Sequence, residues 1–318
     1  MTTRTVHQVI KSMPASDGAG VKLRRSLGQS HFARLDPFLM LDEFSSEDAG
    51  DYIAGFPAHP HRGFETVTYI LDGHMLHEDH LGNKGNLKSG GVQWMTAGRG
   101  IIHSEMPQQD RGRMRGFQLW INLPAKDKMK PASYQDLEAS DIPEVKLGEK
   151  GKVRVIAGSY GGTQAPVKST ATDATYLDVH LPAGATFRHP VKDGYNAFAY
   201  VYEGALEGIP THGAAVFTTE GDVQVKAGDV VARILRGEFI QHQKGIQPRE
   251  VRLAEAAAQL DAGAVGGGHR LDDLVHGSGG HGLLYVSASS DLFKRAITSR
   301  ALASAASLAA GLIARPSA

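Results

Sequence analysis

Apolar residues in this chain fall in short runs that glycines and other turn-forming residues separate. Residues 64–71 are rich in β-branched and aromatic side chains and end at Asp72-Gly73, a strong hairpin signal. Residues 114–123 alternate between apolar and other side chains, as a half-buried strand does. Further strands are predicted at residues 5–13, 21–27, 38–41, 74–80, 92–96, 101–105, 153–156, 174–181, 197–203, 223–225 and 229–235. The pattern predicts an all-β fold.

A weak internal repeat relates the two halves of this pattern. His-Pro at 59–60 precedes YILDG at 69–73, and His-Pro at 189–190 precedes YVYEG at 200–204. Repetition of a β-unit within one chain suggests duplication of a small barrel. In the second copy Val191 stands where a second histidine would be needed, so we expect the copy to keep the architecture without metal ligands.

The strand rhythm is interrupted twice. Residues 126–143 are charged and contain prolines, which is typical of a connector between domains. After about residue 237 the chain becomes rich in glycine and alanine. We therefore predict an N-terminal barrel at 1–130, a C-terminal barrel at 131–240 and an atypical tail, partly helical or disordered, at 241–318.

Composition narrows the class of protein. The 318 residues carry 34 basic and 34 acidic side chains, so the formal net charge is zero and nothing favours long-range attraction to nucleic acid or anionic membrane. The absence of cysteine excludes disulfides and thiolate metal ligands. No run reaches the ~18 apolar residues that a membrane span needs, and residues 301–314 come nearest. We expect a cytoplasmic protein.

Two pairs of candidate metal ligands stand at the ends of the central strand-rich stretch. His59 and His61 are separated by one residue, as are His103 and Glu105. Because side chains alternate faces along a strand, each pair points to one side, and two neighbouring strands can bring all four side chains to one ion. Glu65 has the same parity as His59 and His61, so it is a second candidate carboxylate.

The chemistry of this set limits the metals that it suits. Three imidazoles and a carboxylate suit Fe(II), Mn(II), Ni(II), Cu(II) or Zn(II), and the carboxylate favours an octahedral ion over a closed tetrahedral zinc site. Such an ion keeps open positions for dioxygen, water or a chelating substrate. A single His-x-His pair is more often incidental, but the second pair makes a metal site the better interpretation.

Two other polar clusters have plainer interpretations. The His-rich segment 74–80 is interpreted as the solvated face of a hairpin, where such residues are usually exposed. The basic cluster at 22–25 is interpreted as the solvated side of a strand.

Two segments resemble the pirin family: HPHRGFETVTYILDG at 59–73 and VQWMTAGRGIIHSEMP at 92–107. The resemblance extends from about residue 5 to 235 and includes LDPFLMLDEF at 35–44 and LPAGATFRHPVKDGYNAFAYVYEG at 181–204. It implies two cupin barrels of the double-stranded β-helix or jelly-roll type. It also implies one non-haem iron in the N-terminal barrel and none in the C-terminal barrel.

The same resemblance implies a ligand set. The three histidines and one glutamate of the family map onto His59, His61, His103 and Glu105, whereas Glu65 is left as a residue near the metal without coordinating it. The expected metal is Fe(II), with Mn, Ni, Co, Cu or Zn as alternatives.

Finally, the resemblance implies two functions of different classes. The first is a dioxygenase of the quercetin 2,3-dioxygenase type, which uses dioxygen and a small aromatic, flavonol-like substrate. Glu105 would then act in catalysis by accepting the 3-hydroxyl proton, and Phe56, Trp94 and Met95 would suit a planar ligand. The second is an iron-dependent redox-sensing regulator that binds a protein partner. We expect a monomer without direct contact to nucleic acid or membrane.

Overall fold

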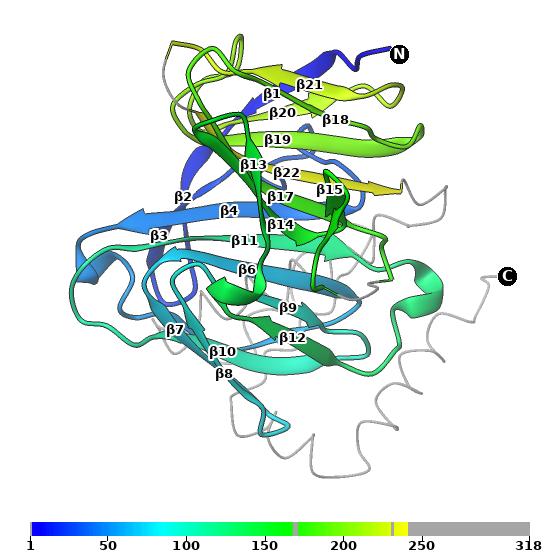
Figure 1. The fold of residues 1–318 in the computed structure, drawn as a ribbon. Coiled ribbons are helices and arrows are strands. Elements are labelled where there is room, and N and C mark those ends of the chain that lie inside the picture. The colour runs from blue at the N-terminus through cyan, green and yellow to red at the C-terminus, as the bar shows by residue number, and fades with distance from the viewer. Residues whose placement is uncertain (1, 168–170, 230–231, 241–318) are drawn as a thin grey trace, which may run out of the picture. The chain divides into compact units, whose positions relative to one another are not determined.

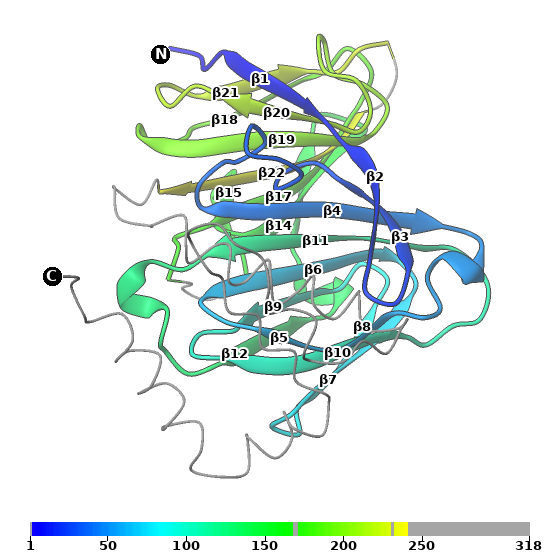
Figure 2. The ribbon, with the colours of Figure 1, turned by 180° about the vertical axis from the view of Figure 1, so that it is seen from behind.

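A computed structural model describes residues 2–167, 171–229 and 232–240, all of which lie in one compact unit, Met1–Gly266. Figure 1 shows these residues as two stacked β-barrels, and Figure 2 shows them from behind. The predicted tail at 241–318 and the apolar segment at 301–314 lie outside the described residues. Within the described part of the chain, no helix is long and apolar enough to cross a membrane.

The first barrel is built from two antiparallel sheets. Its larger sheet has the order β12-β9-β6-β11-β4-β3-β2, and its smaller sheet the order β5-β10-β7-β8. The larger sheet consists of β2 (Met13–Asp17), β3 (Val21–Arg25), β4 (Phe38–Ser46), β6 (Phe64–Asp72), β9 (Val92–Thr96), β11 (Met114–Asn122) and β12 (Ser133–Leu137). The smaller sheet consists of β5 (Phe56–His61), β7 (His74–Asp79), β8 (Lys84–Lys88) and β10 (Ile101–Pro107).

The second barrel has one large sheet with the order β1-β20-β19-β22-β17-β14-β13 and two short hairpins. The sheet consists of β1 (Val6–Lys11), β13 (Glu144–Leu147), β14 (Gly151–Ala157), β17 (Thr175–Leu181), β19 (Tyr195–Glu203), β20 (Gly213–Phe217) and β22 (Ala232–Ile240). The hairpins pair β15 (Ser159–Tyr160) with β16 (Thr163–Gln164), and β18 (Thr186–His189) with β21 (Val223–Lys226). Three short 3-10 helices, at Ala49–Asp51, Ala125–Asp127 and Ala139–Asp141, complete the elements of the described chain.

The all-β expectation and the two-cupin architecture are confirmed. Every predicted strand overlaps an observed one, because alternation and turn signals are local properties of the chain. Residues 5–13 contain β1 and the start of β2 rather than one strand. The segment 126–143, expected to be a connector, contains β12, which pairs with β9 of the first barrel. The last strand continues past the predicted 229–235 to Ile240, paired between β17 and β19.

Strands are also exchanged between the two halves of the sequence. β1 pairs with β20 in the second barrel, although its residues come at the start of the chain. Arg4, just before it, donates hydrogen bonds to the backbone oxygens of Gly221, Tyr195 and Thr218 at 2.6–3.0 Å. The domain boundary near residue 130 stays a prediction.

A buried polar network crosses the interface between the barrels. The carboxylate of Asp178, which is 0% exposed, accepts hydrogen bonds at 2.7 Å from the hydroxyls of Tyr69 in the first barrel and Tyr202 in the second. Arg154 Nη1 donates to the Tyr69 hydroxyl oxygen at 2.7 Å. Burial tends to raise the pKa of Asp178, but hydrogen bonds from His180, Tyr202 and Tyr69 hold it below the usual value.

Replacement of Asp178 tests this network. Asp178→Ala leaves two buried tyrosine hydroxyls without their acceptor, and we expect it to lower the free energy of unfolding by about 3 kcal/mol at pH 7. Because the folded pKa is depressed, the advantage of the wild type is full above about pH 4 and is lost as pH falls through the folded pKa. Urea denaturation across this pH range measures both effects. An effect no larger than that of the exposed-site control Asp110→Ala would contradict the expectation.

Candidate metal centre

The two predicted ligand pairs lie on neighbouring strands of the first barrel. β5 and β10 are antiparallel, and their register places His103 opposite His59 and Ile101 opposite His61. The turn between β5 and β6 is hydrogen-bonded to the turn before β10, from Gly63 N to Gly98 O at 2.7 Å. Strand pairing therefore brings together side chains that are far apart in the sequence.

The three histidines converge through their Nε2 atoms. His59 Nε2 lies 2.9 Å from His61 Nε2 and 3.0 Å from His103 Nε2, and one ligand atom from each ring lies within 4.8 Å of the others. Two nitrogens at right angles on an ion, each about 2.1 Å from it, would be ~3.0 Å apart, whereas tetrahedral angles would separate them by ~3.4 Å. The two spacings from His59 therefore fit right angles at an octahedral ion better than tetrahedral angles.

The protonation states also suit metal binding. His59 Nδ1 lies 2.8 Å from the carbonyl oxygen of Pro57, which only accepts, so the proton belongs on Nδ1 and the Nε2 lone pair faces the other rings. Burial, reinforced by the neighbouring rings, lowers the pKa of His61 and of His103 well below the usual value. Neutral imidazole is the form that ligates metals.

Glu105 lies on the same strand but outside this cluster of three rings. A register shift separates it from His103 in the pairing with β5, and it stands opposite Phe56. Its carboxylate, on a residue 3% exposed, accepts hydrogen bonds from Thr68 Oγ1 at 2.9 Å and Gln118 Nε2 at 3.1 Å. The carboxylate is thus buried and oriented, and its coordination of the metal stays a prediction.

Glu65 points away from the three histidines. Its carboxylate accepts hydrogen bonds from Thr96 at 2.7 Å and from Thr172 of the second barrel at 3.2 Å. The parity argument fails because β5 ends at His61 and the chain turns at Gly63, where φ is 78°, before β6 begins. Burial raises the pKa of Glu65 above the usual value, although the threonine hydrogen bonds oppose it.

His77 was missed as a member of the site. The interpretation of segment 74–80 as a solvated face is wrong for this residue, which is 3% exposed. Its Nδ1 lies 3.2 Å from Nδ1 of His103, and it stands opposite Glu105 in the pairing of β7 with β10. Alternation along the strand could have indicated this burial, because His77 shares its face of the strand with the apolar Met75, which is also 3% exposed.

The aromatic neighbours of the site also differ from expectation. Trp94 belongs to the core cluster that extends across both barrels. Phe64 and Trp120 contact His61 instead, with ring centroids 5.0 and 5.1 Å from it. These rings form an apolar wall beside the histidines. Trp120 lies on β11, two residues after Gln118, which orients Glu105.

Comparisons with known proteins agree with this architecture. The family model described as Pirin matches residues 20–121. A Pseudomonas aeruginosa protein whose name carries a provisional assignment as a quercetin 2,3-dioxygenase is 51% identical over 243 residues, which is 73% of this chain and 85% of that protein. Human pirin is 37% identical over 273 residues, covering 80% of this chain and 91% of that protein.

A solved structure also matches this fold. The crystal structure of quercetin 2,3-dioxygenase from Acinetobacter baumannii matches with a TM-score of 0.71 and 27% identity, covering 83% of this chain and 100% of that one. Two stacked antiparallel barrels with a histidine triad in one of them place the chain among the two-domain cupin proteins. The extent and identity of the matches show more narrowly that it belongs to the pirin family.

The contribution of the triad can be tested by metal binding. We expect His61→Ala, and equally the half-buried His59→Ala, to weaken metal affinity by more than the ~10–100-fold typical of residues that only support ligands. Metal content after anaerobic loading and dialysis, measured by mass spectrometry, checks this. His74→Ala, on the adjoining hairpin, is the matched control. Stoichiometric metal in both triad variants would contradict the site.

The choice between the two carboxylates needs a separate pair of variants. Glu105→Gln should weaken metal affinity by ~10–100-fold if the carboxylate only supports the ligands, and by more if it binds the ion. Glu65→Gln should leave the affinity unchanged, because its carboxylate bonds Thr96 and Thr172 instead of facing the histidines. A metal-loaded structure of the wild type resolves whether Glu105 coordinates. If Glu65→Gln bound the metal more weakly than Glu105→Gln, Glu65 would replace Glu105 as the carboxylate of the site.

Proposed function

We propose that this chain is a metal-dependent dioxygenase that opens the heterocycle of flavonols of the quercetin type. The observation that carries the proposal is the triad of His59, His61 and His103, in which His59 Nε2 lies 2.9 and 3.0 Å from the Nε2 atoms of the other two rings. Two matched proteins, from Pseudomonas aeruginosa and Acinetobacter baumannii, bear names that assign them this activity.

The proposed metal is Fe(II), with Mn, Ni, Co, Cu or Zn as alternatives. His59, His61 and His103 would hold it, together with Glu105. Bound in this way, the ion supplies open coordination positions at which a flavonol and dioxygen can be brought together.

Glu105 is proposed as the proton acceptor. Each oxygen of its carboxylate accepts one hydrogen bond, from Thr68 or Gln118, and a carboxylate has about four acceptor sites in all. It therefore keeps capacity to take the 3-hydroxyl proton of the flavonol. The two hydrogen bonds fix its orientation, which a general base requires before its basicity matters.

Phe64 and Trp120 are proposed to exclude water on the side of His61. Both rings contact that imidazole, and an apolar wall suits a planar aromatic substrate. In the overall reaction both atoms of dioxygen enter the products, and the opened ester forms with loss of one molecule of carbon monoxide. No external reductant is consumed.

We also propose a cellular location and an oligomeric state. A cytoplasmic monomer that takes a small aromatic substrate is the arrangement we propose. A redox-sensing regulator that binds a protein partner is the competing function, and the same experiment separates them.

Turnover of quercetin is the decisive measurement. Protein purified anaerobically and loaded with Fe(II) should consume quercetin and dioxygen together and release carbon monoxide. His61→Ala should abolish turnover, and Glu105→Gln at saturating metal should lower kcat by about 100-fold or more, as loss of a general base does. His74→Ala serves as the control. Stoichiometric iron without turnover, over a panel of flavonols, would reject the dioxygenase and favour the regulator.

A further inference from the structure

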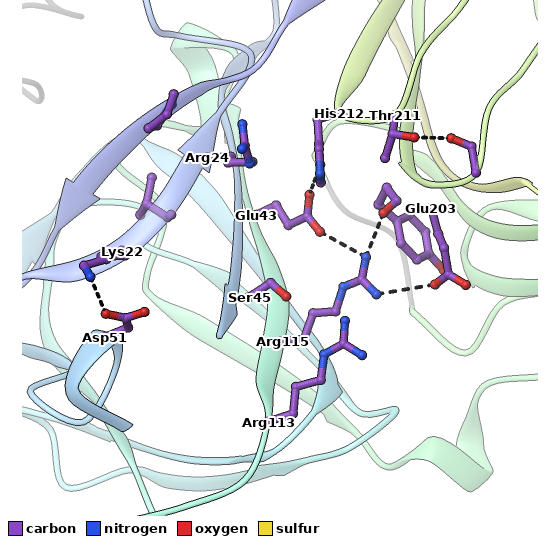
Figure 3. Close-up of a pocket in the computed structure, with 14 residues that line it drawn as sticks. Lys22, Arg24, Glu43, Ser45, Asp51, Arg113, Arg115, Glu203, Thr211 and His212 are labelled. Carbon is purple, nitrogen blue, oxygen red and sulfur yellow. Dashed lines mark hydrogen bonds and ion pairs between the residues drawn. The ribbon is translucent and has the colours of Figure 1, made fainter. Parts of the chain in front are cut away.

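A second pocket lies between the two barrels, away from the metal centre. Its volume is about 620 Å³, within the range of about 300–1,000 Å³ usual for small-molecule sites. Figure 3 shows its charged lining. In the first barrel the lining comes from β3, β4, the 3-10 helix at Ala49–Asp51, β11 and Arg113 just before β11, and in the second from the end of β19 and the turn before β20. None of the proposed metal ligands lines it.

The deepest carboxylate of the pocket is already satisfied. Glu43, 2% exposed, accepts hydrogen bonds from Arg115 Nη2 at 3.1 Å, Tyr200 Oη at 2.8 Å and His212 Nδ1 at 2.9 Å. Burial tends to raise the pKa of Glu43, but hydrogen bonds from His212 and Tyr200 and the charge of Arg115 hold it below the usual value. Glu43 is thus a compensated anion. It holds its three donors, on Arg115, Tyr200 and His212, in place and does not attract a further cation.

The other carboxylates of the lining are also paired. Asp51 lies 2.6 Å from Lys22 Nζ, and Glu203 lies 3.4 Å from Arg115 Nη1. The acidic side chains of the pocket therefore have cationic partners. The charge that the pocket offers to a ligand is decided by the cations that remain.

Three arginines keep unused hydrogen-bond donors. Within the described residues Arg24 makes no ion pair, and Arg113 approaches only Asp72, through Nε at 3.8 Å. Arg115 is 6% exposed, and its Nε has no hydrogen-bond partner in the part of the chain that the structure describes. Guanidinium groups have five donors each, so the pocket has an excess of donors over acceptors.

The backbone at His212 provides an independent observation. Its φ is 61°, in the left-handed region, and His212 N donates to Val201 O at 2.6 Å while its own carbonyl accepts from Ser12 N at 2.9 Å. Non-glycine residues in this region are uncommon, and such conformations concentrate at ligand sites. Because Nδ1 is bonded to Glu43, Nε2 is the nitrogen of the ring that would meet another partner.

We propose that this pocket binds a small anion that carries carboxylate or phosphate groups, held by Arg24, Arg113 and His212. The guanidinium groups of Arg24 and Arg113 match the planar, two-oxygen geometry of a carboxylate and the oxygens of a phosphate. A small molecule is the proposed occupant, because the donors line a pocket of about 620 Å³ shared by the two barrels, a volume usual for small-molecule sites.

Calorimetric titration of the metal-loaded full chain tests the proposal at constant ionic strength. Succinate, citrate and inorganic phosphate are the probes, and comparison of the first two with the third distinguishes carboxylate from phosphate recognition. We expect saturable binding of at least one probe. Arg24→Gln and Arg113→Gln should each weaken it by about tenfold or more, as loss of a charge-assisted hydrogen bond does.

Three controls make the result specific. Arg111→Gln removes a nearby arginine that does not line the pocket and should bind the anion like the wild type. His61→Ala should also bind normally, so failure of the dioxygenase proposal and failure of this one are distinguishable. His212→Asn tolerates the left-handed backbone while removing the ring, and should weaken binding.

Other outcomes overturn the proposal. It fails if no probe binds, or if Arg24→Gln and Arg113→Gln bind as tightly as Arg111→Gln. Tighter binding of a short polyglutamate peptide than of succinate or citrate, lost in the same variants, would reassign the pocket to an acidic protein segment.

Discussion

The antiparallel pairing of β5 with β10 is the constraint on which the candidate metal centre depends. It places His103 opposite His59, and a slip of one residue would turn one strand's histidines to the other face. Gly98 secures the register, because its φ of 52° and its close approach to the carbonyl of Lys130 leave no room for a side chain. Its carbonyl accepts the hydrogen bond from Gly63 that ties the two turns together.

The second barrel supports this arrangement without contributing to the histidine triad. In β6, Thr68 faces the metal centre and bonds Glu105, while its neighbour Tyr69 faces the other barrel and bonds Asp178. In β11, Gln118 likewise faces the candidate metal centre and bonds Glu105, whereas its neighbour Phe117 belongs to the core cluster that extends across both barrels. The sheet that shapes the site is therefore buried on its outer face, which removes freedom from the side chains on its inner face.

The sequence predicts the local features of this structure and fails at those that tertiary packing decides. Strand positions and the convergence of the three histidines follow from alternation with period two, which a chain carries wherever its strands pair. Parity alone makes Glu65 a candidate ligand, but parity does not continue through the turn at Gly63. Burial of His77, and the location of Trp94 between the barrels, depend on which sheet covers each strand.

The basic cluster at 22–25 shows the same limit in electrostatic form. From sequence alone these cations belong on a solvated face, and Arg25 does pair with Asp42 on the adjacent strand, at 2.7 Å. Arg24, one residue before it, points to the other side and lines, with Arg115 and His212, the pocket that the second barrel completes. Whether a charge is solvated or shares a pocket is decided by the neighbouring barrel, which local sequence does not specify.

β11 belongs to both sites, and this restricts how either can change. Arg115 reaches the inter-barrel pocket, whereas Gln118 holds Glu105 and Trp120 lies against His61. A register shift in the pairing with β6 falls between Arg115 and Gly116, and at Gly116 the strands approach too closely for a side chain. Because of this register shift, the part of β11 that carries Arg115 and the part that carries Gln118 and Trp120 are aligned separately with β6. A substitution that straightened β11 would thus displace the carboxylate support as well as the pocket arginine, because one backbone carries both.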